Sequence, residues 1–225
     1  MKSFRFRGSD MIILIGGEKG GSGKTTLACN LAVWGAQNGL DLLLIDGDPQ
    51  ASASRFFERR DESFEGSVTC VRKVGDLYAT VQAMSGRFDA VIIDTGGRDS
   101  IELRTAMAAA DVLVVPTQPS QLDLETLIYL DKVIGTAKSL NPGLSAHCII
   151  SRAPNYPNSI EAQSAKIFIN ALENLSLSRQ AIKDRKIYRD CFILGHGVTE
   201  SKNPQARGEI QLLAQEIFID SQTCV

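Results

Sequence analysis

The chain has 225 residues, enough for one α/β domain with a sizeable core, and its 44% hydrophobic and 22% charged residues exclude an intrinsically disordered protein. A net charge of −2 at pH 7 gives no global attraction to nucleic acids, so any such contact needs a local basic patch. No apolar run reaches the roughly 18 residues of a membrane span, and residues 1–10 lack the apolar core of a signal peptide, so we expect a cytoplasmic protein.

The first predicted element is a buried strand at 11–15, which leads into the glycine-rich loop GGEKGGSGKTT at 16–26. Glycines let such a loop turn tightly and point backbone N–H groups at an anion, and the helix that follows adds the positive end of its dipole. Lys24 is placed to reach the terminal phosphates of a nucleotide, and the Thr25 hydroxyl to bind magnesium between them. The loop therefore predicts a site for ATP with Mg²⁺.

The loop departs from the pattern GxxxxGK[ST] at Glu18, which stands in place of the first glycine, and Lys19 adds a second lysine. In this form, KGGSGKTT resembles the deviant Walker A motif of the ParA/MinD superfamily of P-loop ATPases. The resemblance implies that Lys19 reaches the partner's ATP across a nucleotide-sandwich homodimer, whereas a solvated loop lysine is the alternative. It implies nucleotide contacts from Lys19, Gly20, Gly21, Ser22, Gly23, Lys24, Thr25 and Thr26.

A helix at 25–38 and a second buried strand at 42–45 precede the segment DGDPQ at 46–50. Acidic residues at the carboxyl end of a parallel strand lie where doubly wound sheets bind ligands. A turn that uses Asp and Gly for geometry alone is the alternative. DGDPQ is similar to the Walker A′ segment of the ParA family, which implies that Asp48 orients or activates the attacking water and that Asp46 supports the magnesium site.

A short strand at 67–71 and a helix at 75–84 are expected before a clear buried strand at 88–94, FDAVIID, which ends in an acid as the Walker B pattern does. Asp94 is expected to bind magnesium through water. The sequence TGG at 95–97 follows, and its glycines favour a loop that approaches the γ-phosphate, with a plain turn as the alternative. The expected catalytic residues are Lys19, Lys24 and Asp48, and the expected metal-site residues are Thr25, Asp46 and Asp94.

A helix at 100–110, a strand at 112–115, a long amphipathic helix at 122–140 and a strand at 144–150 complete the alternation. The long helix has four candidate core residues: Leu124, Leu127, Ile128 and Val133. Alternating strands and helices predict an α/β fold with a doubly wound, mainly parallel sheet and helices on both faces, as in P-loop NTPases. We expect one ATPase domain at 11–220, between a short extension at 1–10 and a tail at 221–225.

Arg152 follows the strand at 144–150. Because the ParA family often recognises adenine at this strand end, the resemblance makes Arg152 a candidate base contact, with pairing to a surface acid as the alternative. Further on, RQAIKDRKIYR at 179–189 is rich in basic residues, which are often simply a solvated surface. The resemblance implies nonspecific DNA binding by the ATP-bound dimer. The candidate DNA-binding residues are Lys183, Arg185, Lys186, Arg189, Lys202 and Arg207.

The last predicted helix, at 205–219, has its apolar residues at helical spacing and carries Glu209 and Glu216 on its polar face. A helix lying on a membrane surface would carry lysine or arginine there. We therefore expect this helix to pack onto the domain and expect no membrane contact.

The ParA resemblance implies an ATPase for DNA segregation or cargo positioning. Its ATP hydrolysis would be weak until stimulated by DNA and by a ParB-like centromere-binding protein or cargo adaptor, and the protein would be nucleoid-associated. Two alternatives remain: a MinD-like membrane-associated positioning ATPase, and a metabolic P-loop ligase of the dethiobiotin synthetase type, which needs a substrate pocket beside the γ-phosphate. An iron-protein-like reductase would need paired cluster cysteines, and the five cysteines show no CxxC spacing.

Overall fold

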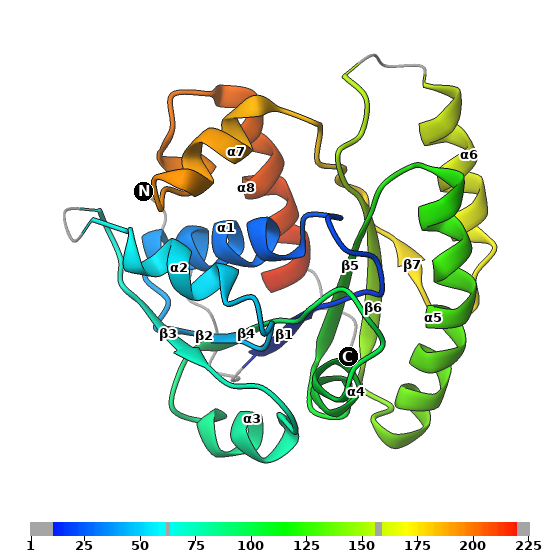
Figure 1. The fold of residues 1–225 in the computed structure, drawn as a ribbon, viewed down its shortest axis with the longest axis horizontal. Coiled ribbons are helices and arrows are strands. Elements are labelled where there is room, and N and C mark those ends of the chain that lie inside the picture. Colours follow the sequence, from blue (N-terminus) through cyan, green and yellow to red (C-terminus); the bar gives the residue numbers. More distant parts are fainter. Residues whose placement is uncertain (1–10, 62–63, 156–158, 220–225) are drawn as a thin grey trace.

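A computed structural model describes residues 11–61, 64–155 and 159–219, so the extension at 1–10 and the tail at 221–225 lie outside the described residues. Seven strands form one sheet in the order β3-β2-β4-β1-β5-β6-β7, and each neighbouring pair is parallel (Figure 1). The strands are β1 (Met11–Ile15), β2 (Leu42–Asp46), β3 (Val68–Arg72), β4 (Ala90–Asp94), β5 (Val112–Thr117), β6 (Ser145–Ile150) and β7 (Ser176–Leu177).

Helices cover both faces of this sheet, which confirms the predicted doubly wound α/β fold. One face carries α1 (Lys24–Gln37), α2 (Ser52–Glu58), α7 (Lys186–Ile193), the short 3-10 helix η1 (Val198–Glu200) and α8 (Pro204–Phe218). The other face carries α3 (Tyr78–Met84), α4 (Ile101–Met107), α5 (Gln121–Leu140) and α6 (Ile160–Asn170).

The central strand β1 shows why the sheet is buried on both sides. Every residue of β1 is apolar and buried. Successive side chains of a strand point to opposite faces. Ile13 and Ile15 accordingly join the core under α1 and α8, whereas Ile12 and Leu14 join the core under α4 and α5. The carboxyl end of β1 is thereby fixed from both faces, and the glycine-rich loop leaves from that end.

The long helix α5 corrects one core prediction. Leu124, Leu127 and Val133 are buried, but Ile128 is 47% exposed. Each helical residue is rotated about 100° from the one before it. Ile128 follows the buried Leu127 and is carried beyond the buried stripe, so its assignment to the core was wrong.

The last helix, α8, packs against α1, as expected from its apolar spacing. The ring of Trp34 in α1 stacks on Phe218 in α8, with centroids 5.5 Å apart and planes inclined by 30°. The two glutamates of α8 do not form a solvated polar face: Glu209 is only 8% exposed, and Glu216 accepts hydrogen bonds from the segment at 178–180. That part of the prediction was wrong. Among the described helices, none has the length and apolar character to span a bilayer.

Candidate functional site: a phosphate loop beside an apolar recess

The glycine-rich loop joins β1 to α1 and leaves the start of that helix open. Gly21 and Gly23 have φ of 76° and 96°, a left-handed conformation that favours glycine. Among the residues that the structure describes, no side chain caps α1, so the N–H groups of its first turn are not bonded by a capping group. This arrangement suits an anion such as a phosphate.

Lys24 lies inside this loop and is only 6% exposed. Its Nζ donates to the carbonyl oxygen of Lys19 at 2.7 Å. Burial lowers the pKa of Lys24, while Asp94 and Asp48 act in the opposite direction. The buried ammonium group is therefore held at the phosphate loop with two carboxylates near it.

The two strand-end carboxylates, Asp46 and Asp94, are cross-strand neighbours on β2 and β4, and both are completely buried. Asp46 Oδ2 accepts from the N–H and the hydroxyl of Ser54, both at 2.7 Å, and Oδ1 accepts from the Asp48 N–H at 3.3 Å. Asp46 thus fixes the start of α2 and the DGDPQ turn. Because both of its carboxylate oxygens already accept hydrogen bonds from the protein, Asp46 can support the site by holding these two segments in place.

Asp94 differs because neither of its buried carboxylate oxygens has a hydrogen-bond partner of acceptable geometry among the described residues. Burial raises the pKa of Asp94 to about 8, although the Thr25 hydroxyl and Lys24 lower it. A buried carboxylate without a partner is costly unless a cation compensates for it. With the Thr25 hydroxyl nearby, these oxygen groups fit a hard cation such as Mg²⁺.

The loop after β4 lies against both neighbouring loops. A Cβ on Gly96 would lie 3.6 Å from Cγ of Asp48, and a Cβ on Gly97 would lie 2.7 Å from the backbone nitrogen of Gly20. Only glycine fits at position 97 without moving the phosphate loop. Asp48 itself is half-buried and accepts from the Gln50 N–H at 2.9 Å.

The phosphate loop, Asp48 and Gly97 line one open pocket, whereas the completely buried Asp46 and Asp94 are not among its lining residues. Its lining residues are Gly20, Gly21, Gly23, Lys24, Thr25, Thr26, Asp48, Ser52, Gly97, Arg152 and Phe192. A narrower recess adjoins it and shares Gly23, Thr26 and Arg152 with it. Apolar side chains line much of this recess, namely Leu27, Pro116, Ile182, Tyr188 and Ile210. An apolar recess beside a phosphate site is suited to bind a flat, largely apolar ring.

Arg152 stands at the border of the pocket and the recess. Its φ of 48° is a left-handed conformation that is uncommon for a residue with a side chain. The preceding residue is anchored, because the Ser151 hydroxyl donates to the carbonyl oxygen of Ser22 at 2.7 Å. The structure therefore brings Arg152 next to the phosphate loop.

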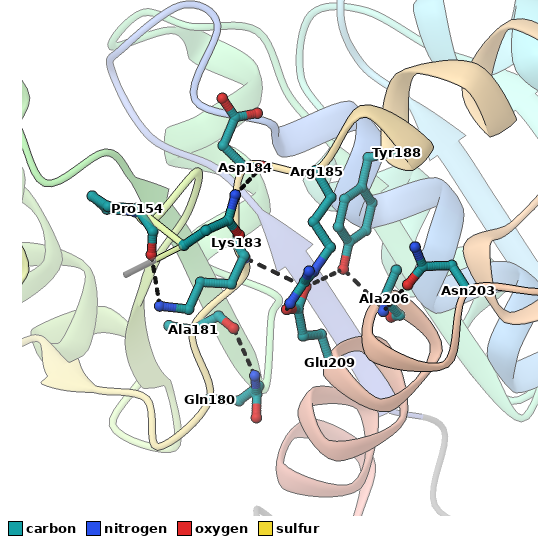
Figure 2. Close-up of polar contacts among 11 residues, drawn as sticks. Pro154, Gln180, Ala181, Lys183, Asp184, Arg185, Tyr188, Asn203, Ala206 and Glu209 are labelled. Atoms are coloured by element: carbon teal, nitrogen blue, oxygen red, sulfur yellow. Dashed lines mark hydrogen bonds and ion pairs between the residues drawn. The ribbon is translucent and has the colours of Figure 1, made fainter. Parts of the chain in front are cut away.

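The opposite wall of the recess is the segment at 182–189, which is bonded to the residues after β6. The Ala153 N–H donates to the Ile182 carbonyl at 2.9 Å, and the Asp184 N–H donates to the Ala153 carbonyl at 3.0 Å. Figure 2 shows Lys183 reaching the Pro154 carbonyl, at 2.8 Å. Two segments far apart in sequence are thus fixed side by side around the recess.

The six candidate DNA-binding residues divide into two groups. Lys183 and Arg185 are half-buried and bind protein groups, the Pro154 carbonyl and the Glu209 carboxylate respectively. The others are exposed, namely Lys186, Arg189, Lys202 and Arg207. Two of these form surface ion pairs, Lys186 with Asp190 at 2.8 Å and Arg189 with Asp184 at 2.9 Å.

Several residues of the site were not predicted from the sequence. Ser54, which binds Asp46, lies in α2, a helix that was not predicted from the sequence. Phe192 and Tyr188 belong to α7, and Glu209 contacts the recess wall from α8. The sequence offered one signal for α2. The apolar residues Phe56 and Phe57 follow the DGDPQ turn closely, as expected for a short helix that starts after it.

Comparison with known proteins places this geometry among nucleotide-binding domains. A model of the family described as CobQ/CobB/MinD/ParA nucleotide binding domain matches residues 13–188. A relative from Gloeobacter kilaueensis, named Maintenance of carboxysome distribution protein A, is 40% identical over 111 residues, which are 49% of this chain and 50% of that protein. The protein of the same name from Halothiobacillus neapolitanus is 24% identical over 204 residues, covering 89% of this chain and 93% of that protein.

A solved structure shows the likeness in fold. The ATP complex of McdA from Cyanothece aligns with a TM-score of 0.76 at 20% identity, covering 93% of this chain and 97% of that chain. The first relative is matched over half of its length, whereas the second relative and the solved structure are matched over nearly all of theirs.

Proposed function

The chain belongs to the family of CobQ/CobB/MinD/ParA nucleotide-binding domains, and from this premise we propose that it is a ParA-type ATPase that positions DNA or another cellular cargo. The observation that carries the proposal is the buried, unpartnered carboxylate of Asp94 beside Lys24 and Thr25 at the phosphate loop. These groups suit a nucleoside triphosphate with its metal ion. The relatives named for carboxysome distribution support a positioning role.

In the proposed site, the loop at 20–26 binds the phosphates through its backbone N–H groups and Lys24. Thr25 and Asp94 would hold Mg²⁺, with Asp46 supporting them through the DGDPQ turn. When bound, the metal ion neutralises charge on the terminal phosphates. Asp48 orients or activates the attacking water, and the recess beside Arg152 receives the base.

We propose further that residues 11–220 act as one ATPase domain that forms a homodimer around ATP, with Lys19 reaching the partner's nucleotide. The dimer binds nonspecific DNA through the exposed residues Lys186, Arg189, Lys202 and Arg207. Lys183 and Arg185 contribute less because their side chains are half-buried and bind groups of the protein, whereas Lys186 and Arg189 remain exposed in spite of their surface ion pairs. A ParB-like or cargo adaptor stimulates hydrolysis and releases the dimer from the nucleoid.

The first test concerns the nucleotide reaction. Asp48→Ala should retain ATP-dependent dimerisation and lose hydrolysis, whereas Lys19→Ala should lose the ATP-dependent dimer. Size-exclusion chromatography with light scattering and a phosphate-release assay measure the two properties. Normal turnover in Asp48→Ala would contradict the water role, and a persistent ATP-dependent dimer in Lys19→Ala would contradict the cross-subunit role.

The second test concerns DNA. Binding to random-sequence duplex DNA is measured with ATP, ADP or no nucleotide across a salt series. We expect binding only with ATP, weakening steeply with salt because phosphate contacts release counterions. The double change Lys202→Glu with Arg207→Glu should abolish it, whereas Lys166→Glu on α6, across the sheet, is the matched control. Absence of DNA binding in every nucleotide state would refute the DNA-binding part of the proposal.

A further inference from the structure

Two glutamates of α8 hold the same stretch of chain at different points. Glu209 and Glu216 are separated by about two helical turns. Glu216 accepts hydrogen bonds from the Ser178 hydroxyl and the Arg179 and Gln180 N–H groups. These three residues do not line the recess beside the phosphate loop.

Glu209 binds the part of the stretch that forms the recess wall. Its Oε1 accepts from Arg185 Nε at 2.9 Å and lies 2.8 Å from Arg185 Nη2. Its Oε2 accepts from the Tyr188 hydroxyl at 2.9 Å and from the Lys183 N–H at 3.4 Å. Figure 2 shows these groups converging on the single carboxylate from one turn of α8.

The carboxylate can hold these donors firmly because it is buried. Glu209 is 8% exposed, and Tyr188 is 7% exposed. Burial, with Glu209 as a further cause, raises the pKa of Tyr188, so its hydroxyl remains a donor at neutral pH. Hydrogen bonds to a charged acceptor are stronger than neutral ones, and a low local dielectric strengthens them further.

All three donors belong to residues that line the recess, namely Lys183, Arg185 and Tyr188. The phosphate loop, by contrast, is fixed by β1 and α1, and among the described residues Glu209 forms its hydrogen bonds with Lys183, Arg185 and Tyr188 and not with these two elements. A change at Glu209 should therefore move the wall that faces the base and leave the phosphate contacts in place.

We propose that Glu209 is a positioning residue for base recognition, which sets the place of the wall at 183–188 and thereby the discrimination between purine bases. The inference rests on the proposed function, because it assumes that a nucleotide occupies the recess. Glu209 acts through Lys183, Arg185 and Tyr188 and does not itself touch the base.

The test measures the affinities of the full chain for ATP, GTP and inorganic tripolyphosphate by titration calorimetry. Glu209→Gln is compared with the wild type and with Glu216→Gln, the matched control on the same helix. Tyr188→Phe removes one hydroxyl from the Glu209 carboxylate and serves as a milder second variant. Thermal unfolding of each variant reports whether it is folded.

We expect the wild type to prefer ATP over GTP. Glu209→Gln should weaken ATP binding about tenfold, which corresponds to the loss of roughly one charged hydrogen bond. It should also bring the affinities for ATP and GTP closer together. Tripolyphosphate binding should stay within about twofold of the wild type. Tyr188→Phe should shift the ATP preference in the same direction by less, and Glu216→Gln should leave it unchanged.

Several results would overturn the inference. One is an unchanged ATP-to-GTP ratio in both Glu209→Gln and Tyr188→Phe. Another is an equal loss of ATP and tripolyphosphate binding in Glu209→Gln, or the same loss of base preference in Glu216→Gln, because either would indicate a general structural effect. A wild type that binds tripolyphosphate without base preference would also refute it. A wild type that binds neither ATP nor tripolyphosphate would refute the proposed function itself, and with it this inference.

Discussion

At the scale of single residues, the contact between Gly97 and the phosphate loop sets a strict steric limit in the site. A Cβ at position 97 would meet backbone atoms of Gly20 at 2.7 and 2.8 Å, and backbone cannot move aside as a flexible side chain can. The loop after β4 and the phosphate loop are therefore mechanically linked. A shift of either loop should displace the other loop.

Gly97→Ala should displace the phosphate loop and lower the rate of ATP hydrolysis on the order of 100-fold, because misplacement by about 1 Å has effects of that size. Phosphate release measures it. The control is Gly208→Ala in α8, where an added Cβ meets no atom of the described part of the chain within 4 Å. That variant should keep its hydrolysis rate and gain about 0.5–1 kcal/mol in the free energy of unfolding. Equal hydrolysis by both variants would contradict the proposed link.

Glu18, the unusual residue of the phosphate loop, gives a pH-dependent prediction. Its Oε1 is buried without a hydrogen-bond partner among the described residues, and burial raises its pKa, with Asp99 adding to the effect and Arg104 opposing it. A raised folded-state pKa means that the charged carboxylate destabilises the folded state. This penalty is present above the folded pKa and disappears as pH falls to the unfolded value of 4.5.

Glu18→Gln should therefore raise the free energy of unfolding at neutral pH, by about 0.5 kcal/mol once solvent screening is allowed for. The gain should shrink as the pH falls toward 4.5, the ordinary pKa of the group. Urea unfolding of both proteins across this pH range measures it. Glu173→Gln, at an exposed carboxylate, is the control, and a gain that grows toward acidic pH would show that the sign is wrong.

Much of the site's residue set could be predicted from the sequence because it is local. Lys24 and Thr25 follow a glycine loop, and Asp46 and Asp94 end apolar strands, so their meeting at one sheet edge follows from parallel topology. Partners supplied by distant segments could not be predicted. Nothing in the sequence near Glu209 indicates that it binds residues 21, 24 and 26 positions earlier, because that pairing depends on how α8 packs.

At the scale of elements, the buried apolar strands and the long helices α1, α5 and α8 were predicted closely, whereas several other elements were missed. The helix at 101–107 is shorter than the predicted 100–110, and α3 begins at Tyr78, three residues after the predicted start. The helices α2, α6 and α7 and the strand β7 were not predicted from the sequence. The two residues of β7 are too few for any period, and α7 carries charged residues that were interpreted as a basic surface segment.

One buried ion pair joins the segment after α2 to η1. Arg60 Nη1 and Nη2 lie 2.8 and 2.6 Å from the two carboxylate oxygens of Glu200, and the side chains are 8% and 5% exposed. Glu200 also accepts from the Gly197 N–H at 2.8 Å. Removal of one partner leaves a buried charge without its counterion. The loss of stability should therefore be large when only one of the two residues is replaced.

Arg60→Ala should lower the free energy of unfolding by about 3–5 kcal/mol, measured by urea denaturation. The exposed pair of Lys186 with Asp190 provides the control, since its side chains are 79% and 43% exposed. Lys186→Ala should cost no more than about 0.5 kcal/mol. Similar losses in the two variants would mean that burial does not decide the value of these ion pairs.

At the scale of the whole molecule, the alternation of strands and helices was sufficient to predict the doubly wound parallel sheet. It could not predict which helices share a face, because that depends on the strand order, with β1 between β4 and β5. This order places α1 and α8 together and brings the wall at 182–189 next to the phosphate loop. The recess is therefore a product of topology, whereas the phosphate loop is a product of local sequence.

The stacked pair of Trp34 and Phe218 has a practical consequence. Trp34 is the only tryptophan of the chain, and it is 5% exposed where α1 meets α8. Indole emission moves to longer wavelength when water replaces an apolar neighbour. The protein thus contains an intrinsic fluorophore at the C-terminal end of α8, the helix that carries Glu209. Detachment of α8 would appear as a red shift in its spectrum, even in a molecule whose sheet is still intact.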